Sequence, residues 1–239
     1  MFVVPINKDN PVRKKPWVVF ALIFINGVVL VLEYLDTPTV WFAAHGFVPA
    51  HPSISTAFTS MFLHAGFWHY AGNMFFLWMF GNRVENVLGR VTFALVYLVG
   101  GFGATFIQYL SSAHSTIPLV GASGAISGIV GCFFALFPRS KFDLSFYFGW
   151  LRLKTIETTA LWAVLTWFGE QTLLGLIVSA AHVAGGVAYW AQAGGFAFGA
   201  AIGMMFRKMW SAEELQRRDE DEPDDPIGPT SGDVIGLRS

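Results

Sequence analysis

Two glycine-rich stretches decide how this chain folds: LVGASGAISGIVG at residues 119–131 and AQAGGFAFGAAIG at residues 191–203. In both, a small residue recurs every three or four positions, so each predicts a helix with one flat face. Small residues allow two helix backbones to approach closely, which is how many helices pack inside a lipid bilayer. We therefore expect the two faces to pack on each other through Gly124 and Gly128 in the first stretch and Gly195 and Gly199 in the second.

The composition around these stretches is that of a membrane protein. Of the 239 residues, 54% are hydrophobic and only 13% are charged, with nine Trp and 24 Phe. Soluble domains carry about twice that share of charged residues, so the composition predicts a chain that crosses the membrane several times. It excludes a disordered protein, a coiled coil and a nucleic-acid-binding protein. Cys132 is the single cysteine, which excludes an intramolecular disulfide, and we expect it to pack in the core.

Long windows without charge locate the membrane spans. Residues 37–82, 91–138 and 171–206 contain no Asp, Glu, Lys or Arg. A transmembrane helix needs roughly 20 apolar residues, so the first two windows are too long for one span each. Division at turn-like segments predicts an all-α fold with six membrane-spanning helices, at about 17–35, 58–80, 91–110, 121–137, 156–176 and 188–206. We expect the first of them to be a signal anchor that is retained.

The distribution of positive charge predicts the orientation in the membrane. All 15 Lys and Arg residues fall in the alternate segments 1–16, 81–90, 138–155 and 207–239. Short cytoplasmic loops carry such an excess, so both termini are predicted to be cytoplasmic. We expect a multi-pass protein of the cell (inner) membrane.

Three regions follow from this topology: a cytoplasmic N-terminal tail at 1–16, a six-helix membrane domain at 17–208 and an acidic cytoplasmic tail at 209–239. Nine of the 16 Asp and Glu residues lie in the last 33 positions. From Ser211 on, the tail contains proline and no aromatic residue, so we expect it to be disordered.

Polar residues within the predicted spans are the candidates for function, because they are costly at membrane depth. His69 and Asn73 are four residues apart, so both point from one face of the second helix. Ser123 lies at the mouth of the fourth helix. It is either a nucleophile or merely a small residue in a packing motif. The remaining polar residues at this depth are His64, Gln108, Ser127, Glu170 and Gln192.

Three stretches together resemble the rhomboid intramembrane serine proteases: FTSMFLHAGFWHYAGNMFFLWMFGNRVE at 58–85, GASGAISG at 121–128 and YWAQAGGFAFG at 189–199. With the six-span topology, the resemblance covers most of residues 17–206. It implies a six-helix rhomboid-like bundle that cleaves the transmembrane segments of membrane proteins within the lipid bilayer, without a cofactor or a metal. It also implies that Ser123 is the nucleophile, that His69 and Asn73 help to stabilise the oxyanion, and that Gly121 flanks the site.

The sequence departs from this family at the general base. The family's last helix begins HxxGxxxG, and in that register Gln192 occupies the position of the catalytic His. A carboxamide has no titratable group near neutral pH, so it can form a hydrogen bond with Ser123 but cannot take its proton.

His182 also begins an HxxG pattern and is the alternative base. Ser123 precedes the cytoplasmic Arg139 by 16 residues and Gln192 precedes Arg207 by 15, whereas His182 precedes Arg207 by 25. In a continuous helix His182 would lie roughly 15 Å higher than Ser123. We therefore expect His182 to be a loop residue, unless that loop folds over the site.

Other protease types are disfavoured by the residues present. The sequence contains no HExxH motif, and no acidic ligand accompanies His64 and His69, which argues against a zinc protease. No pair of membrane-embedded Asp residues exists for an aspartyl protease. Two hypotheses remain: a serine endopeptidase whose activity is weak or absent as written, and an inactive rhomboid-like protein that binds transmembrane helices. A transporter is disfavoured because the sequence shows no internal repeat.

Overall fold

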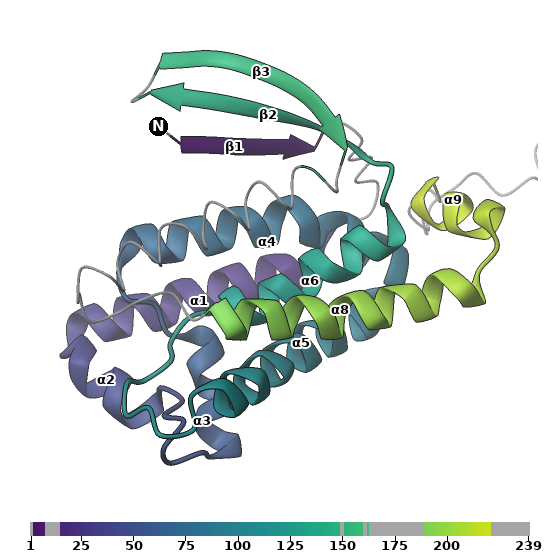
Figure 1. Ribbon diagram of the computed structural model, residues 1–239. Helices are drawn as coiled ribbons and strands as arrows, with labels where there is room; N and C mark the ends of the chain where they lie inside the picture. The colour runs from purple at the N-terminus through teal and green to yellow at the C-terminus, as the bar shows by residue number, and fades with distance from the viewer. Residues whose placement is uncertain (1, 8–14, 149–150, 160–161, 163–188, 221–239) are drawn as a thin grey trace, which may run out of the picture.

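The computed structural model describes residues 2–7, 15–148, 151–159, 162 and 189–220, and these residues are mostly helical (Figure 1). The helices are α1 (Trp17–Leu35), α2 (Pro38–His45), α3 (Ile54–Thr59), the 3-10 helix η1 (Ser60–Phe62), α4 (Phe67–Leu88), α5 (Arg90–Ser111), α6 (Ser123–Leu136), α8 (Tyr189–Met209) and α9 (Ala212–Glu220). The strands are β1 (Phe2–Asn7), β2 (Lys141–Phe148) and β3 (Leu151–Thr159).

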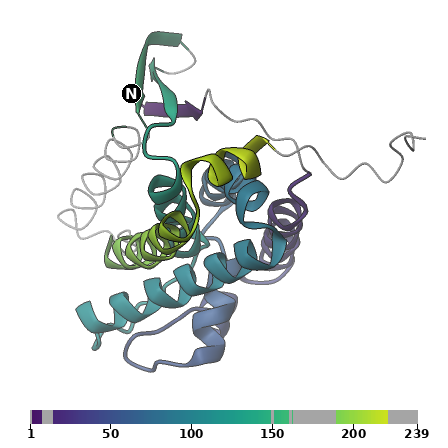
Figure 2. The same ribbon diagram turned by 90° about the vertical axis from the view of Figure 1, so that its right-hand side faces the viewer.

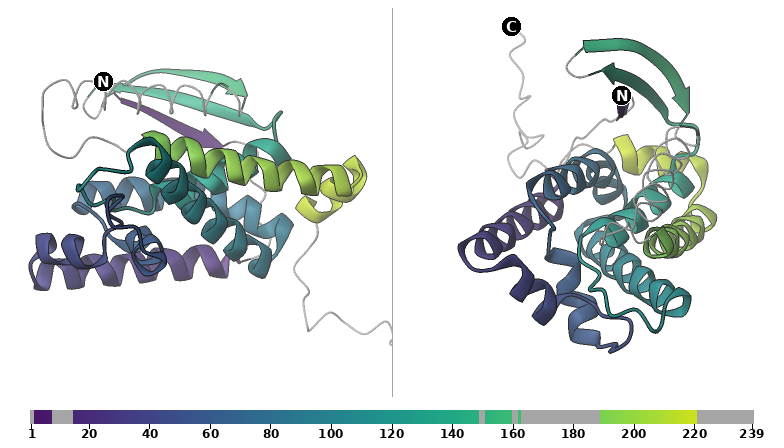
Figure 3. Two further views of the ribbon diagram at one scale, coloured as in Figure 1. Left: turned by 60° about the horizontal axis from the view of Figure 1, so that its bottom comes forward. Right: turned by 60° about the vertical axis from the view of Figure 1, so that its left-hand side comes forward.

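The long helices form a bundle in which α6 packs against α4, α5 and α8 (Figure 3). Large aromatic side chains fill the core around α6: Phe80, Phe93, Tyr97 and Phe133 are each at most 1% exposed. The long apolar runs in the sequence supply this core, and α6 itself is buried along nearly its whole length. Cys132 also lies buried there, as predicted.

Two of the described helices, α1 and α5, are long and apolar enough to cross a membrane, and α6 is apolar but shorter. The bounds of α1, α5, α6 and α8 lie within a few residues of four predicted spans. At the start of α1, the backbone N–H groups of Val18 and Val19 donate to the Glu85 carboxylate of α4, at 3.0 and 2.9 Å. A carboxylate there satisfies unpaired N–H groups and complements the helix dipole, so it ties α4 to the beginning of α1.

The prediction of one continuous helix over residues 58–80 is wrong. The chain leaves η1 after Phe62 and starts α4 only at Phe67, which then continues to Leu88. Gly66 has a φ of +136°, a backbone conformation that other residues rarely adopt, and it ends the extended segment just before α4. The break therefore occurs at Gly66, which lies inside the apolar run that predicted a single helix.

The chain is not all-α, because the three strands form an antiparallel sheet in the order β1-β2-β3. The sheet lies on the side of the bundle away from α5 (Figures 1 and 2). Polar and apolar residues alternate in KFDLSFYF, the sequence of β2, and this period of two favours a strand. The predicted fifth span began at residue 156, which is wrong for residues 156–159 because they belong to β3. Apart from Trp162, the rest of that span lies outside the described residues.

Part of the acidic tail is ordered, contrary to the prediction of disorder from Ser211. The Ser211 Oγ accepts a hydrogen bond from the Glu214 N–H at 3.1 Å and so caps α9. Arg218 pairs with Glu214 one turn earlier, at 3.1 Å. Asp219 then binds Arg83 of α4, and this tertiary contact fixes the helix against the bundle.

The glycine faces of α6 and α8 are in contact, as the sequence predicts. A Cβ atom at Gly195 would collide with the carbonyl oxygen of Gly124, and one at Gly199 would collide with that of Gly128. On its other side, α6 meets α5, since a Cβ at Gly128 would lie 2.7 Å from the Gly100 Cα. Backbone therefore packs on backbone along this helix pair.

We expect Gly199→Ala to lower the free energy of unfolding by about 1–3 kcal/mol, because the new methyl group has only backbone to displace. Gly72→Ala is the matched control, since Gly72 is exposed on α4 and a Cβ there would meet nothing within 4 Å. Thermal unfolding of both variants in detergent measures the difference. Equal stability of the two variants would contradict the packing of α6 on α8.

Candidate active site

The Ser123 side chain stands at the first residue of α6, directly after a constrained turn. Gly121 has a φ of +126° and its N–H donates to the Ser60 carbonyl oxygen at 2.9 Å. Upstream, Phe47 and Leu119 exchange two backbone hydrogen bonds, at 3.0 and 2.8 Å. These bonds fix the path of the chain that leads into the helix.

His69 lies beside this turn. A Cβ atom at Gly121 would come within 2.7 Å of the His69 Cε1 and 2.9 Å of its Nε2, and it would lie 3.8 Å from the Ser123 Oγ. Glycine is therefore required at position 121 both by its φ and by the closeness of the imidazole. The structure brings together the histidine of α4 and the serine of α6.

The hydrogen bonds of His69 fix which of its nitrogens can donate. The Ala65 N–H donates to the His69 Nδ1 at 3.3 Å. In the neutral ring one nitrogen accepts and the other carries the hydrogen, so this bond assigns the hydrogen to Nε2. Nε2 is the nitrogen that lies beside Gly121, so in this tautomer the ring offers an N–H donor there.

Asn73 follows His69 by one turn of α4. Its side chain is 8% exposed, and within the described residues its Nδ2 has no hydrogen-bond partner. A buried donor without a partner is costly, so this N–H is available to a group that binds beside α4. His69 and Asn73 thus offer two donors from one face of α4.

Gln192 lies near the start of α8, at the level of Ser123. The glycine contacts advance together along both helices, from Gly124 with Gly195 to Gly128 with Gly199, so α6 and α8 run in the same direction. A Cβ at Gly124 would also lie 4.0 Å from the Ala191 carbonyl oxygen. Ser123 directly precedes Gly124, and Gln192 directly follows Ala191. These two residues therefore lie where the contact between the two helices begins.

The Gln192 side chain is 4% exposed, and its Oε1 is buried with no hydrogen-bond partner among the described residues. This acceptor belongs to the residue after Ala191, whose carbonyl oxygen faces Gly124 at the start of α6. His182, the alternative base, lies outside the described residues.

Glu33 of α1 was not singled out from the sequence. It is 1% exposed, and its carboxylate accepts the His64 N–H at 3.2 and 3.4 Å. The His64 ring in turn packs edge-on against the His69 ring, with the centroids 5.3 Å apart. Glu33 is the one charged residue within α1. A single acid in an otherwise uncharged, apolar helix is the sequence signal that points to a specific role. It holds the segment that positions His69.

No group of three or more His, Cys, Asp or Glu side chains that could hold a metal ion occurs in the part of the chain that the structure describes.

Comparisons with known proteins relate this chain to one protein family. The family model of the Rhomboid domain matches residues 51–209. The chain is 34% identical over 131 residues to Rhomboid protein 1, mitochondrial, of Saccharomyces cerevisiae, which covers 52% of this chain and 37% of that protein. It is 31% identical over 148 residues to Rhomboid protease GluP of Bacillus subtilis, covering 61% of this chain and 25% of that protein.

A shorter match, 42% identical over 73 residues, relates it to RHOMBOID-like protein 6, mitochondrial, of Arabidopsis thaliana, and covers 30% of this chain and 23% of that protein. The matched segments thus cover well under half the length of each of these relatives.

Proposed function

Because the chain belongs to the rhomboid family of membrane proteases, we propose that it is an intramembrane serine endopeptidase of this type, whose hydrolysis is slow as written. Its substrates are the transmembrane segments of other membrane proteins. The observation that carries the proposal is that the Ser123 and His69 side chains both lie beside the turn at Gly121.

In this mechanism the Ser123 Oγ attacks the carbonyl carbon of a peptide bond. The negative charge that develops on the carbonyl oxygen is stabilised by the His69 Nε2–H, the Asn73 amide and the backbone N–H of Ser123 at the start of α6. The C–N bond then breaks, the amine leaves with a proton, and water hydrolyses the acyl-enzyme. Both the attack and the departure need a group that takes and returns the serine proton.

Gln192 supplies no such group, which is why we expect slow turnover. Its amide can only orient the Ser123 hydroxyl or a substrate N–H. The remaining rate enhancement then comes from the oxyanion donors and from binding, as it does in serine proteases that have lost a triad member.

A second candidate function is a protein that binds transmembrane segments without cleaving them. The observation in its favour is a pair of buried groups that have no hydrogen-bond partner among the described residues, the Asn73 Nδ2 donor and the Gln192 Oε1 acceptor. A peptide group offers one acceptor and one donor, so an unwound stretch of a bound helix could satisfy both.

Photo-crosslinking and cleavage of a single-span substrate in liposomes distinguish the two functions. For a slow protease we expect crosslinking together with slow cleavage that Ser123→Ala abolishes, while crosslinking is retained. A binding protein would crosslink without any product that depends on Ser123. Cleavage that persists in Ser123→Ala would contradict the assignment of the nucleophile, and His182→Ala tests whether the loop residue acts as the base.

The proposed topology has six spans, both termini in the cytoplasm and the site in the exterior half of the membrane. It is supported by the segregation of Lys and Arg in the sequence. It is also supported by the bundle, because Ser123 starts α6 at one end whereas Arg83 and Arg207 lie near the other end, at the close of α4 and α8.

Cysteine labelling measures this topology. In a Cys132→Ala background, Thr116→Cys is expected to react with a membrane-impermeant maleimide in intact cells, whereas Lys208→Cys reacts only after permeabilisation. Both positions are exposed, so access to the side chain itself does not limit the reaction. The reverse pattern would overturn the orientation.

A further inference from the structure

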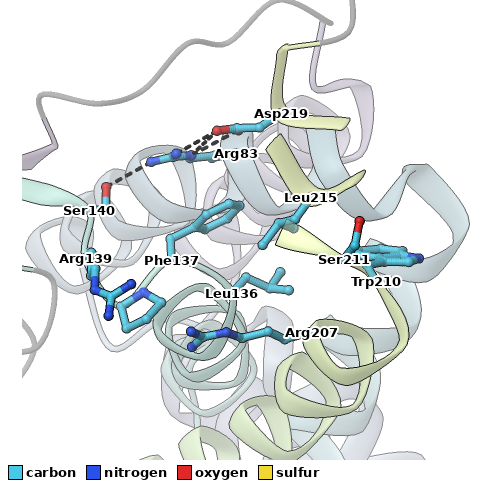
Figure 4. A pocket seen from close by; sticks show the side chains of 11 residues that line it. Arg83, Leu136, Phe137, Arg139, Ser140, Arg207, Trp210, Ser211, Leu215 and Asp219 are labelled. Carbon is cyan, nitrogen blue, oxygen red and sulfur yellow. Dashed lines mark hydrogen bonds and ion pairs between the residues drawn. The ribbon is translucent and has the colours of Figure 1, made fainter. Parts of the chain in front are cut away.

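A pocket lies at the end of the bundle opposite Ser123 (Figure 4). It has a volume of about 520 Å³ and is formed by the end of α6, the segment that follows it, the end of α8 and α9. Since α6 has 14 residues, the pocket lies roughly 20 Å from Ser123 along the helix axis. It is therefore separate from the candidate active site.

The charges that line this pocket are unequal. Three arginines, Arg83, Arg139 and Arg207, and one aspartate, Asp219, are among the lining residues. Arg83 donates to both Asp219 carboxylate oxygens and, at 2.9 Å, to the Ser140 Oγ, and its guanidinium lies 4.1 Å from the centre of the Phe137 ring. Asp219 is thus paired with Arg83. The two other arginines leave the lining with an excess of two positive charges.

Arg139 and Arg207 provide that excess. Both are exposed, and Figure 4 shows them reaching toward the pocket from the segment after α6 and from α8. The Arg207 Nη1 donates to the Ala135 carbonyl oxygen at 3.2 Å, which holds the guanidinium at this position. Like charges that line one pocket repel each other, and a bound anion would offset that repulsion. The planar donor pairs of the two guanidinium groups fit the oxygens of a phosphate.

We propose that this pocket binds the phosphate of an anionic phospholipid headgroup through Arg139 and Arg207. The assignment of the phosphate rests on the charge and shape of the pocket. The assignment to a lipid rests on the topology proposed above, which puts the pocket at the cytoplasmic membrane surface, where anionic headgroups are enriched. Trp210, which also lines the pocket, is of the residue type that anchors proteins at this depth.

The test uses the full chain in a neutral detergent, with dihexanoyl phosphatidylglycerol, dihexanoyl phosphatidylcholine and inorganic phosphate as probes, and native mass spectrometry to measure binding. We expect the phosphatidylglycerol to bind at least about tenfold more tightly than the phosphatidylcholine, since only the first keeps a net charge for the two arginines. The double variant R139Q/R207Q should lose this preference. The matched control R90Q should keep it, because Arg90 is an exposed arginine at the start of α5 that does not line the pocket.

An equal loss in R90Q, or a preference retained in R139Q/R207Q, would overturn the site. Inorganic phosphate that binds as tightly as the phosphatidylglycerol would support the phosphate site and overturn the lipid as its source. If the double variant does not fold, as judged by gel filtration, R139Q alone carries the test, because its side chain is exposed. Cleavage is not measured, so failure here leaves the role of Ser123 unaffected, and failure of Ser123 leaves this site unaffected.

Discussion

Gln192→His is expected to raise the cleavage of a single-span substrate by roughly 10³- to 10⁶-fold, the range that loss of a triad member costs in serine proteases. The reason is geometric and chemical. Gln192 begins the face of α8 that packs on α6, at the level of Ser123, and an imidazole there, unlike a carboxamide, can take and return a proton. Initial rates in liposomes at equal protein concentration measure the gain.

Two further variants make this result specific. Ser123→Ala in the Gln192→His background should return the rate to the background level, which shows that the gain passes through the serine. Gln192→Ala should leave the slow rate of the unmodified chain unchanged. If the unmodified chain already cleaves at the rate of a complete protease and Gln192→Ala does not alter it, the base is elsewhere and His182 becomes the candidate. No gain in a correctly folded Gln192→His protein would favour the binding function.

Asn73→Ala, made in the Gln192→His background, should lower kcat by about 10²- to 10³-fold, the effect of removing one oxyanion donor. Stability should not fall with it, because the Asn73 Nδ2 has no partner among the described residues that the change would leave unpaired. Activity and the thermal midpoint are therefore expected to separate, which a purely structural asparagine would not allow.

Asn82→Ala is the control for this change. Asn82 is also a buried asparagine of α4, and its Oδ1 is likewise unpartnered within the described part of the chain, but it lies nine residues further from the site. It should leave kcat unchanged. A similar loss of kcat in both variants would mean that Asn73 acts through the packing of α4 and not through the transition state.

The sequence predicted the features of the fold that depend on long, regular patterns of residues. The apolar runs located α1, α5, α6 and α8, because each helix must hide its backbone within its own hydrogen bonds. The glycine spacing predicted the contact of Gly128 with Gly199, because close approach of two backbones tolerates no side chain. The motifs also predicted that Gly121 flanks Ser123 and His69, and both side chains do lie beside it.

The rest depends on contacts between distant segments. β2 pairs with β1 across more than 130 residues, so no local window of the sequence could show that residues 2–7 form a strand. The ordering of α9 needs the bond from Asp219 to Arg83. In the site, the donor role of the His69 Nε2 follows from the Ala65 N–H, and the turn at Gly121 follows from the Ser60 carbonyl, and neither backbone group is visible in a motif.

The carboxylate of Glu33 on α1 sets a minimum length for any working piece of this protein. The match to the family begins at residue 51, so α1 lies before it. Glu33 of α1 nevertheless accepts the backbone N–H of His64, whose ring packs against that of His69. A shortened chain that started at residue 51 would contain Ser123, His69 and Asn73. It would lack Glu33, and with it the hydrogen bond that holds His64 beside the His69 ring. For this fold, the N-terminal limit of a fragment that keeps the site intact is set by a buried acid on the first helix and not by the start of the matched family segment.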